Sequence, residues 1–260
     1  VPKHLILYDW FGYTPPSYTH LPLILNPDKS KLSKRQGDVS VESYLEKGFL
    51  EEALLNFIAI LGFNPSSDRE IYTQEELMAA FDIKKVSKSG PIFDVNKLLW
   101  MNGQYIKKLS DEAFLARVKP FVKGEVEDDI LRRICVIEKT RINLLSEINA
   151  VITSYQTIPD FTKEMLIWKK SDSDDAKLQL ENIHKLLLGT DDSMFDDLQL
   201  IEQAVAGYIK DNELKNGNVL WPLRVSLSGA ERSPSPFELL WVLQKQESLK
   251  RIEHAIKILS

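Results

Sequence analysis

A basic, serine-containing segment near the start of the chain is the clearest candidate for chemistry. Residues 26–35 read Asn-Pro-Asp-Lys-Ser-Lys-Leu-Ser-Lys-Arg and follow a short apolar run. Pro27 cannot donate a ladder hydrogen bond, so a loop is expected there in place of a central strand. Lysine ammonium groups on such a loop could contact a triphosphate, each charge pair being worth about 4 kcal/mol at ~4 Å and an effective dielectric of ~20 before desolvation. A solvated charged turn has the same composition, so composition leaves both interpretations open.

Charge and cysteine content limit the other functions that the chain could have. It carries 33 Lys and Arg against 38 Asp and Glu, so RNA contacts would have to come from local basic patches. Its one cysteine, Cys135, lies in an apolar helical stretch and is expected to be a buried free thiol. The acidic clusters at 172–175 and 191–197 lack the spacing of a calcium loop, so no bound metal is expected. No apolar run approaches the roughly 20 residues that span a bilayer, and no signal peptide is evident, which favours a cytosolic protein without a membrane partner.

The segments that must position the basic loop are mostly helical. The first 40 residues predict a helix, a short strand and a functional loop. Trp100 and Tyr105 fall within apolar helical spacing and are predicted to be core. The helices expected next are 43–61 ended by Gly62, one begun by a capping box of Thr73 and Glu76, and 95–101 capped by Asp94 and ended by Asn102-Gly103.

Beyond residue 110 strand signals are almost absent, which predicts a helical bundle or superhelix. Polar stretches at 170–175 and 189–193 are expected to be loops or a subdomain joint. The last helix is amphipathic with mixed charges, which favours core packing over membrane binding. The expected helices are roughly 111–122, 127–153, 162–168, 174–188, 198–211 and 237–259.

The order of residues in the basic loop resembles a known signature. Lys31-Leu32-Ser33-Lys34-Arg35 is similar to the KMSKS loop of class I aminoacyl-tRNA synthetases, in the KLSKR form of bacterial glutamyl-tRNA synthetases. The resemblance spans nearly the whole chain and is weakest between about 145 and 215. The other stretches that follow the family in order are 4–8, 11–13, 20–24, 26–29, 44–54, 61–63, 90–94, 97–98, 100–106, 222–224, 228–229 and 233–234.

This resemblance implies a mainly α chain in three parts. Residues 1–37 would be the C-terminal edge of the catalytic domain, 38–108 a helical stem-contact domain, and 109–260 an all-helical anticodon-binding domain. The last part would have two subdomains with a joint near 165–175. Glutaminyl enzymes share the catalytic half but read the anticodon with β-barrels, so the helices expected here favour a glutamyl enzyme.

The resemblance also implies a reaction. The family forms glutamyl-adenylate from glutamate and ATP, supplied as Mg-ATP, and then transfers the acyl group to tRNA(Glu). Lys31 and Lys34 would stabilise the triphosphate and the departing pyrophosphate, and Ser33 would shape the loop with backbone amides. Leu32 and Arg35 complete the ATP-binding loop.

Further residues match positions that the family uses for tRNA. Arg141 and Arg224 would contact the anticodon, with Ser233 and Pro236 in the loop that follows Arg224. A surface arginine without a partner remains an alternative for Arg141, and a structural ion pair for Arg224. Candidate phosphate contacts in the stem-contact region, which could equally be ordinary solvated surface, are Lys84, Lys85 and Lys88.

The second class I signature, of HIGH type, is not found. None of the four histidines lies at a helix start in a nucleotide-binding context, so the glutamate pocket and most of the ATP site are expected upstream of Val1. The chain then looks truncated, inactive alone and, by family expectation, monomeric. The alternative is a free-standing tRNA-binding or protein-interaction module without catalysis. A nucleotide-binding fold in the upstream reading frame would distinguish the two.

Overall fold

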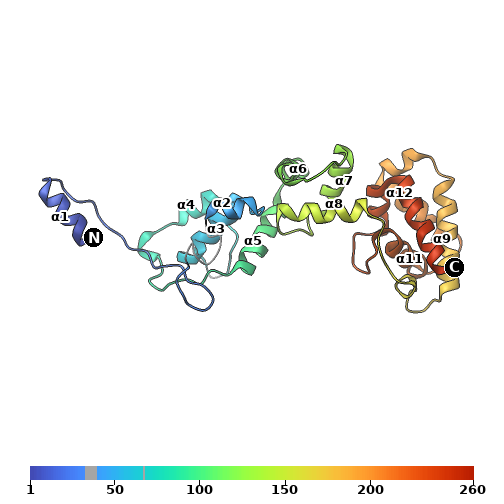
Figure 1. Cartoon of the computed structure of the whole chain (residues 1–260), viewed down its shortest axis with the longest axis horizontal. Coiled ribbons are helices and arrows are strands. Elements are labelled where there is room, and N and C mark those ends of the chain that lie inside the picture. The colour runs from blue at the N-terminus through green and yellow to red at the C-terminus, as the bar shows by residue number, and fades with distance from the viewer. Residues whose placement is uncertain (33–39, 67) are drawn as a thin grey trace. The chain divides into compact units, whose positions relative to one another are not determined.

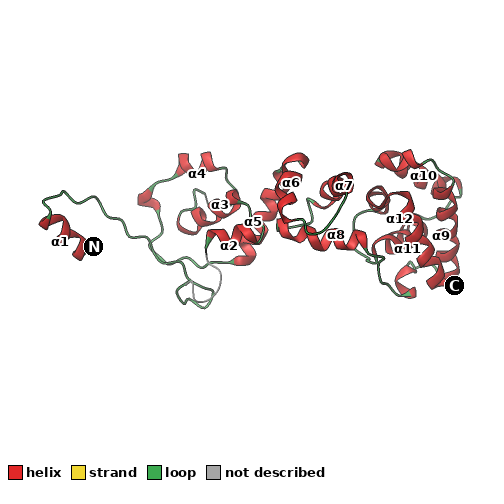
Figure 2. Ribbon diagram, turned by 45° about the horizontal axis from the view of Figure 1, so that its top comes forward, coloured by secondary structure: helices red, strands yellow, loops and turns green. Residues whose placement is uncertain are grey.

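The computed structural model describes residues 1–32, 40–66 and 68–260, and the chain divides into two compact units, residues 1–105 and 106–260. Within these described ranges the regular structure is helical, which confirms the mainly α prediction (Figures 1 and 2). The predicted short strand does not form there. Leu25 makes only isolated bridges, antiparallel to Lys31 and parallel to Ile92.

The first unit contains α1 to α4 and most of α5. The predicted capping box is confirmed, because the Thr73 hydroxyl accepts a hydrogen bond from the Glu76 amide at 3.2 Å and the Glu76 carboxylate accepts one from the Thr73 amide at 2.7 Å. The predicted helix 43–61 is instead two helices, because Gly48 takes a left-handed φ of 95° between them. The elements are α1 (Pro2–Trp10), α2 (Val41–Glu46), α3 (Glu51–Gly62), α4 (Gln74–Ala80), the 3-10 helix η2 (Ile83–Lys85) and α5 (Val95–Lys108).

Helix α5 corrects two predictions. Its Asp94 cap is as predicted, with the Asp94 carboxylate accepting from the Asn96 amide at 2.9 Å. The expected end at Asn102-Gly103 is wrong, because the helix continues and the buried Asn102 side chain accepts a hydrogen bond from the Leu50 amide at 2.8 Å. Trp100 is 45% exposed and is not core; its neighbour Met101 occupies the buried face.

The second unit contains the remaining helices. The predicted helix 127–153 is wrong as one element, because α7 and α8 are separated by a turn and a 3-10 segment. Helix α12 is broken at Gln244, whose φ of 60° and ψ of 176° are non-helical. The elements are α6 (Asp111–Val118), η3 (Lys119–Phe121), α7 (Asp128–Glu138), η4 (Leu145–Glu147), α8 (Ile148–Gln156), η5 (Lys163–Leu166), α9 (Ser173–Leu188), η6 (Asp192–Asp196), α10 (Leu198–Asp211), α11 (Asn216–Ser228) and α12 (Pro236–Leu259).

A buried arginine joins three of these helices. Arg251 of α12 is 1% exposed, and its guanidinium donates to the carbonyl oxygens of Leu227 at 2.6 Å, Tyr155 at 2.6 Å and Thr157 at 2.8 Å. Its Nε also donates to Glu247 at 2.9 Å. These carbonyls lie at the ends of α8 and α11, where intrahelical partners run out. Arg251 therefore satisfies two helix termini at once.

Two further features of the fold concern the cysteine and the apolar length of the helices. Cys135 is 1% exposed, as predicted, and burial raises the pKa of its thiol to about 12, so it stays protonated and unreactive at neutral pH. No helix among the described residues is long and apolar enough to cross a bilayer.

Candidate nucleic-acid interface

The basic loop begins as a tight turn fastened to a distant segment. The Leu25 amide donates to the Pro91 carbonyl at 2.8 Å, and the Leu32 amide donates to the Ile24 carbonyl at 3.1 Å. Gly90 permits this close approach, because a Cβ there would lie 2.9 Å from the Leu23 carbonyl oxygen. The turn that carries Lys29 and Lys31 is therefore held at both of its ends.

Within the turn, Lys29 takes a left-handed φ of 66° and Asp28 accepts hydrogen bonds from the Ser30 amide at 2.9 Å and hydroxyl at 2.6 Å. The Ser30 hydroxyl bond lowers the pKa of Asp28, which keeps the carboxylate charged and the turn closed. Lys31 follows directly and is exposed, without an ion pair to any residue that the structure describes. The predicted contacts Ser33, Lys34 and Arg35 lie outside the described residues, whereas Leu32 is half-buried.

Two of the three candidate lysines of the stem-contact region line a cleft in the first unit, whereas Lys85 is exposed outside it. Lys84 and Lys88 are exposed, and with His20, Leu21 and Ser87 they border a cleft of about 390 Å³. The Lys84 amide is capped by the Asp82 carboxylate at 2.9 Å, which fixes the 3-10 turn that carries Lys84 and Lys85. Exposed lysines at the border of a cleft can contact a phosphate group.

Arg141 lies in the turn that follows α7. Its side chain is 43% exposed, and its Nε lies 3.8 Å from a carboxylate oxygen of Glu138. Glu138 is 7% exposed, and its other oxygen accepts a hydrogen bond from the Tyr155 hydroxyl at 2.8 Å. Burial raises the pKa of Glu138, opposed by the Tyr155 hydrogen bond and the Arg141 charge. Neither Nη atom of Arg141 is hydrogen-bonded to a residue in the described ranges, so both could meet an external acceptor.

The structure brings Arg224 and Ser233 together. Arg224, on α11, is half-buried and donates to the Ser233 carbonyl at 3.0 Å. The chain can turn here because Gly229 takes a left-handed φ of 67° after α11. Pro236 is buried as the first residue of α12. Arg224 thus supports the loop before α12 through a hydrogen bond, and it makes no ion pair with any described residue.

These two sets of residues lie in one region of the second unit. Helix α12 packs against α7, and the charge of Glu238, in the first turn of α12, helps raise the pKa of both Glu138 and Tyr155. Arg141 and the loop before α12 therefore share one local environment. Sequence reasoning missed Glu138 and Tyr155. The spacing of Glu138 three residues before Arg141 was a usable signal, but nothing local connects Tyr155 to either residue.

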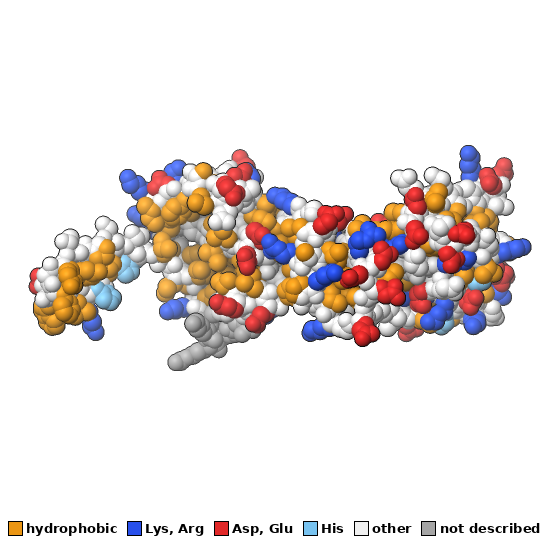
Figure 3. All heavy atoms as spheres, turned by 90° about the horizontal axis from the view of Figure 1, so that it is seen from above, with side chains coloured by type: hydrophobic (Ala, Val, Ile, Leu, Met, Phe, Trp, Pro, Cys, Tyr) orange, Lys and Arg blue, Asp and Glu red, His pale blue; other side chains and the backbone are white. Residues whose placement is uncertain are grey.

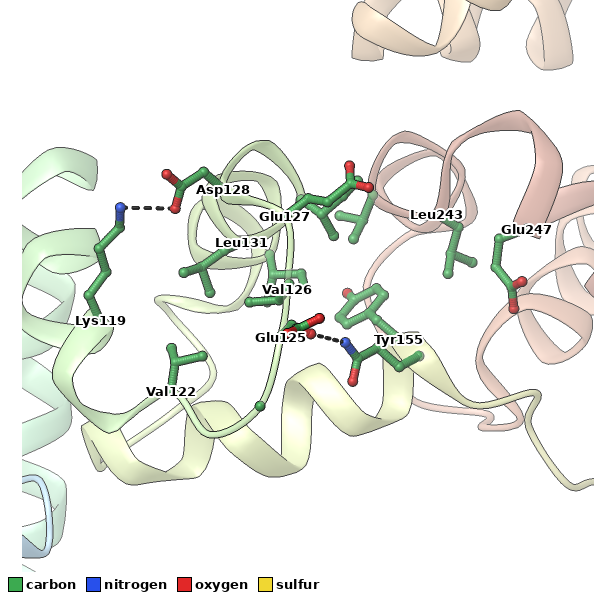
Figure 4. Close-up of a pocket in the computed structure, with 15 residues that line it drawn as sticks. Lys119, Val122, Glu125, Val126, Glu127, Asp128, Leu131, Tyr155, Leu243 and Glu247 are labelled. Atoms are coloured by element: carbon green, nitrogen blue, oxygen red, sulfur yellow. Dashed lines mark hydrogen bonds and ion pairs between the residues drawn. The ribbon is translucent and has the colours of Figure 1, made fainter.

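The second unit also carries an acidic groove, which Tyr155, the partner of Glu138, helps to line (Figure 4). It has a volume of about 920 Å³ and is bordered by Glu125, Glu127, Asp128 and Glu247. This sign of charge disfavours phosphate. The face of the molecule drawn in Figure 3 mixes acidic and basic side chains. Among the described residues no group of three or more histidine, cysteine or acidic side chains could hold a metal ion.

Two known domain families match successive parts of the chain. Residues 1–100 match the class I tRNA synthetase catalytic domain of the glutamyl and glutaminyl type, and residues 113–256 match an anticodon binding domain. These two matches place the chain in the class I aminoacyl-tRNA synthetases.

Individual relatives narrow this class. The chain is 40% identical over 262 residues to a glutamate–tRNA ligase of Clostridium kluyveri, covering 98% of the chain and 53% of the relative. It is 39% identical to the glutamate–tRNA ligase of Lachnoclostridium phytofermentans, in an alignment that covers 100% of the chain and 53% of the relative. A solved glutamate tRNA ligase from Elizabethkingia meningosepticum superposes with a TM-score of 0.80 at 28% identity, covering 99% of this chain and 55% of that one. The chain belongs to the bacterial glutamyl-tRNA synthetase family and spans about half the length of the curated relatives it matches.

Proposed function

We propose that this chain supplies the signature loop and the tRNA-binding surface of a glutamate–tRNA ligase, which joins glutamate to tRNA(Glu) through glutamyl-adenylate. The observation that carries the proposal is the pairing, in one chain, of a class I catalytic match over residues 1–100 with a helical anticodon-binding match over 113–256. Relatives that align along 98% of the chain are glutamate–tRNA ligases.

ATP would be held at the loop that starts from the turn at residues 26–31. That turn is fastened at Leu25 and leaves Lys31 exposed, so its ammonium group can meet phosphate oxygens. Lys31 and Lys34 would stabilise the triphosphate of Mg-ATP and the leaving pyrophosphate, with Ser33, Leu32 and Arg35 shaping the loop. In the complete enzyme, Lys34→Ala is expected to lower the adenylation rate by about 10²–10³, as for the loss of one preorganised donor. Pyrophosphate exchange within about threefold of wild type would contradict this role.

The tRNA would be read by the second unit. Arg141 has its Nε beside Glu138, which leaves its Nη groups for a base edge, and bidentate reading by arginine discriminates bases by ~1–3 kcal/mol. Arg224 would hold the loop at Ser233, and with it Pro236 at the start of α12, against the anticodon. Basic side chains of the first unit would contact stem phosphates.

Binding of labelled tRNA to the chain tests this proposal directly. The chain should bind tRNA(Glu) more tightly than tRNA(Gln), and Arg141→Ala should reduce that preference by about 5–150-fold, the equivalent of ~1–3 kcal/mol. Arg132→Ala is the matched control, because Arg132 is an exposed arginine on α7, paired with Asp129 at 2.9 Å. Equal affinity of the unmodified chain for the two tRNAs would refute anticodon reading.

Activity measurements separate the enzyme from a binding module. The chain alone is expected to bind tRNA(Glu) without charging it, whereas the product of the complete reading frame should charge it with ATP and glutamate. A complete product that binds tRNA but lacks charging activity would favour the module without catalysis. We further propose a cytoplasmic monomer, which predicts a solution mass near 29.8 kDa for the chain.

A further inference from the structure

The acidic groove of the second unit has an apolar floor. Its wall residues Val122 and Val126 are half-buried, while Leu131, Tyr155 and Leu243 form a floor with 3–7% of their surfaces exposed (Figure 4). The volume of about 920 Å³ lies within the range of about 300–1,000 Å³ that is usual for ligand sites. The groove can therefore take apolar side chains, but only a few of them.

The rim of the groove has an excess of negative charge. Asp128 is paired with Lys119 at 3.0 Å, and Glu247 is paired with Arg251 at 2.9 Å. Glu125 and Glu127 are exposed, and neither carboxylate is paired with a described residue. Two carboxylates beside an apolar floor are complementary to a segment that carries both cations and apolar side chains.

The walls of the groove are fixed. The Gln156 side chain donates to the Glu125 carbonyl at 2.9 Å, and the Lys123 amide donates to the Asn149 side chain at 2.8 Å. Next to the lining residue Leu243, Gln244 holds a φ of 60° that residues with side chains rarely adopt, and its side-chain amide donates to the Phe195 carbonyl at 2.9 Å. A strained residue of this kind persists only where its surroundings hold it, and such residues are enriched at ligand-binding sites.

We propose that this groove binds a short segment of a partner protein in which apolar residues are flanked by lysine or arginine. The apolar side chains would cover Leu131, Tyr155 and Leu243, and the cations would pair with Glu125 and Glu127. A nucleic acid is a poor occupant because its phosphates would meet the same carboxylates. The inference goes beyond the proposed function, since it requires neither ATP nor charging of tRNA.

Fluorescence anisotropy with a defined probe tests the groove. The probe is a labelled peptide of two leucines flanked on each side by two lysines, and it should bind the chain saturably and more weakly as salt is added. A peptide with glutamates in place of the lysines and one with serines in place of the leucines should each bind at least about tenfold more weakly. Equal binding of either control peptide would overturn the proposal, as would no binding of the probe.

Variants of the chain locate the binding. Glu125→Lys combined with Glu127→Lys should weaken binding of the probe peptide by about tenfold or more. The matched control is Glu181→Lys with Glu202→Lys, which reverses two exposed acidic residues on α9 and α10 and should leave the affinity unchanged. Equal loss in both double variants would show an effect of net charge and overturn the assignment.

A substitution that leaves the charge of the groove unchanged distinguishes a peptide from RNA as its occupant. Ile130→Trp fills the groove from its half-buried wall without changing its charge, and it should weaken the probe while leaving affinity for tRNA(Glu) unchanged. Thermal unfolding near that of the unmodified chain confirms that the variant folds. Loss of tRNA affinity with unchanged probe binding would make RNA the occupant and overturn the proposal. Failure of the chain to bind tRNA at all would count against the proposed function only.

Discussion

Replacement of Arg251 by methionine is expected to destabilise the second unit strongly. The arginine is 1% exposed and donates to the backbone carbonyls of Leu227, Tyr155 and Thr157, which lie 24–96 residues away in the sequence. Methionine has a similar length but no donor, so these carbonyls would lose their partner inside the protein. Each unsatisfied buried group costs about 1–3 kcal/mol, and removal of one member of a buried charged pair costs about 3–5 kcal/mol. We expect Arg251→Met to lower the free energy of unfolding by about 3–5 kcal/mol.

Urea unfolding at 25 °C, followed by tryptophan fluorescence, measures this loss. Trp168, Trp221 and Trp241 all belong to the second unit and report on its packing. With a slope of about 1–3 kcal/mol per molar urea, the midpoint should fall by about 1–5 M. The control is Lys250→Met, because Lys250 is 60% exposed and contacts the same Glu247 at 3.4 Å.

The two variants together decide whether the buried carbonyls matter. Loss of the exposed Lys250 pair should change the free energy of unfolding by no more than about 0.5 kcal/mol. If Arg251→Met cost less than about 1 kcal/mol, or no more than Lys250→Met, the helix ends would not depend on this arginine and the reasoning would be refuted.

Three other perturbations probe local features. Gly217→Ala should destabilise the second unit by about 1–3 kcal/mol in urea unfolding, because its Cβ would lie 2.4 Å from Nε1 of the packed Trp168 indole; an unchanged midpoint would contradict this. Hydrogen bonds from Arg132 and Arg133 lower the pKa of Asp129, so its stabilisation is present above the unfolded pKa of about 4 and is lost as pH falls through the lower folded value. Asp129→Asn should therefore make the free energy of unfolding fall less steeply as the pH is lowered from 6 to 2. A variant with the same pH profile as the unmodified chain would show that Asp129 makes no such contribution. Thr73→Ala should cost the first unit about 1 kcal/mol in thermal unfolding by removing the capping box, whereas Thr73→Ser should cost little.

Local patterns in the sequence were sufficient for several features. The Thr73–Glu76 capping box needs only residues three positions apart, so the sequence specifies it directly. The helical character beyond residue 110 follows from apolar spacing, and the burial of Cys135 follows from its apolar surroundings. The signature at residues 31–35 identified the family, although the structure describes only Lys31 and Leu32 of it.

Other features depend on partners that are distant in the sequence. Helix α5 continues through Asn102-Gly103 because the buried Asn102 side chain accepts a hydrogen bond from the Leu50 amide, 52 residues away. Trp100 has the spacing of a core residue, yet only the packing of the unit determined which face of α5 is buried, and that face contains Met101.

The surroundings of Arg141 likewise combine features set by the local sequence with features set by distant residues. The sequence alone predicted Arg141 within one helix over 127–153 and determined its charge, its reach and its resemblance to an anticodon contact. That the helix ends at Glu138, just before this arginine, was decided by the tertiary structure. Only the tertiary structure decided that Glu138 is buried beside it and that Tyr155, 17 residues after Glu138, donates a hydrogen bond to that carboxylate. Periodicity reports which side of a helix is apolar, but the partners of a buried polar group are set by chain segments that meet only when the protein folds.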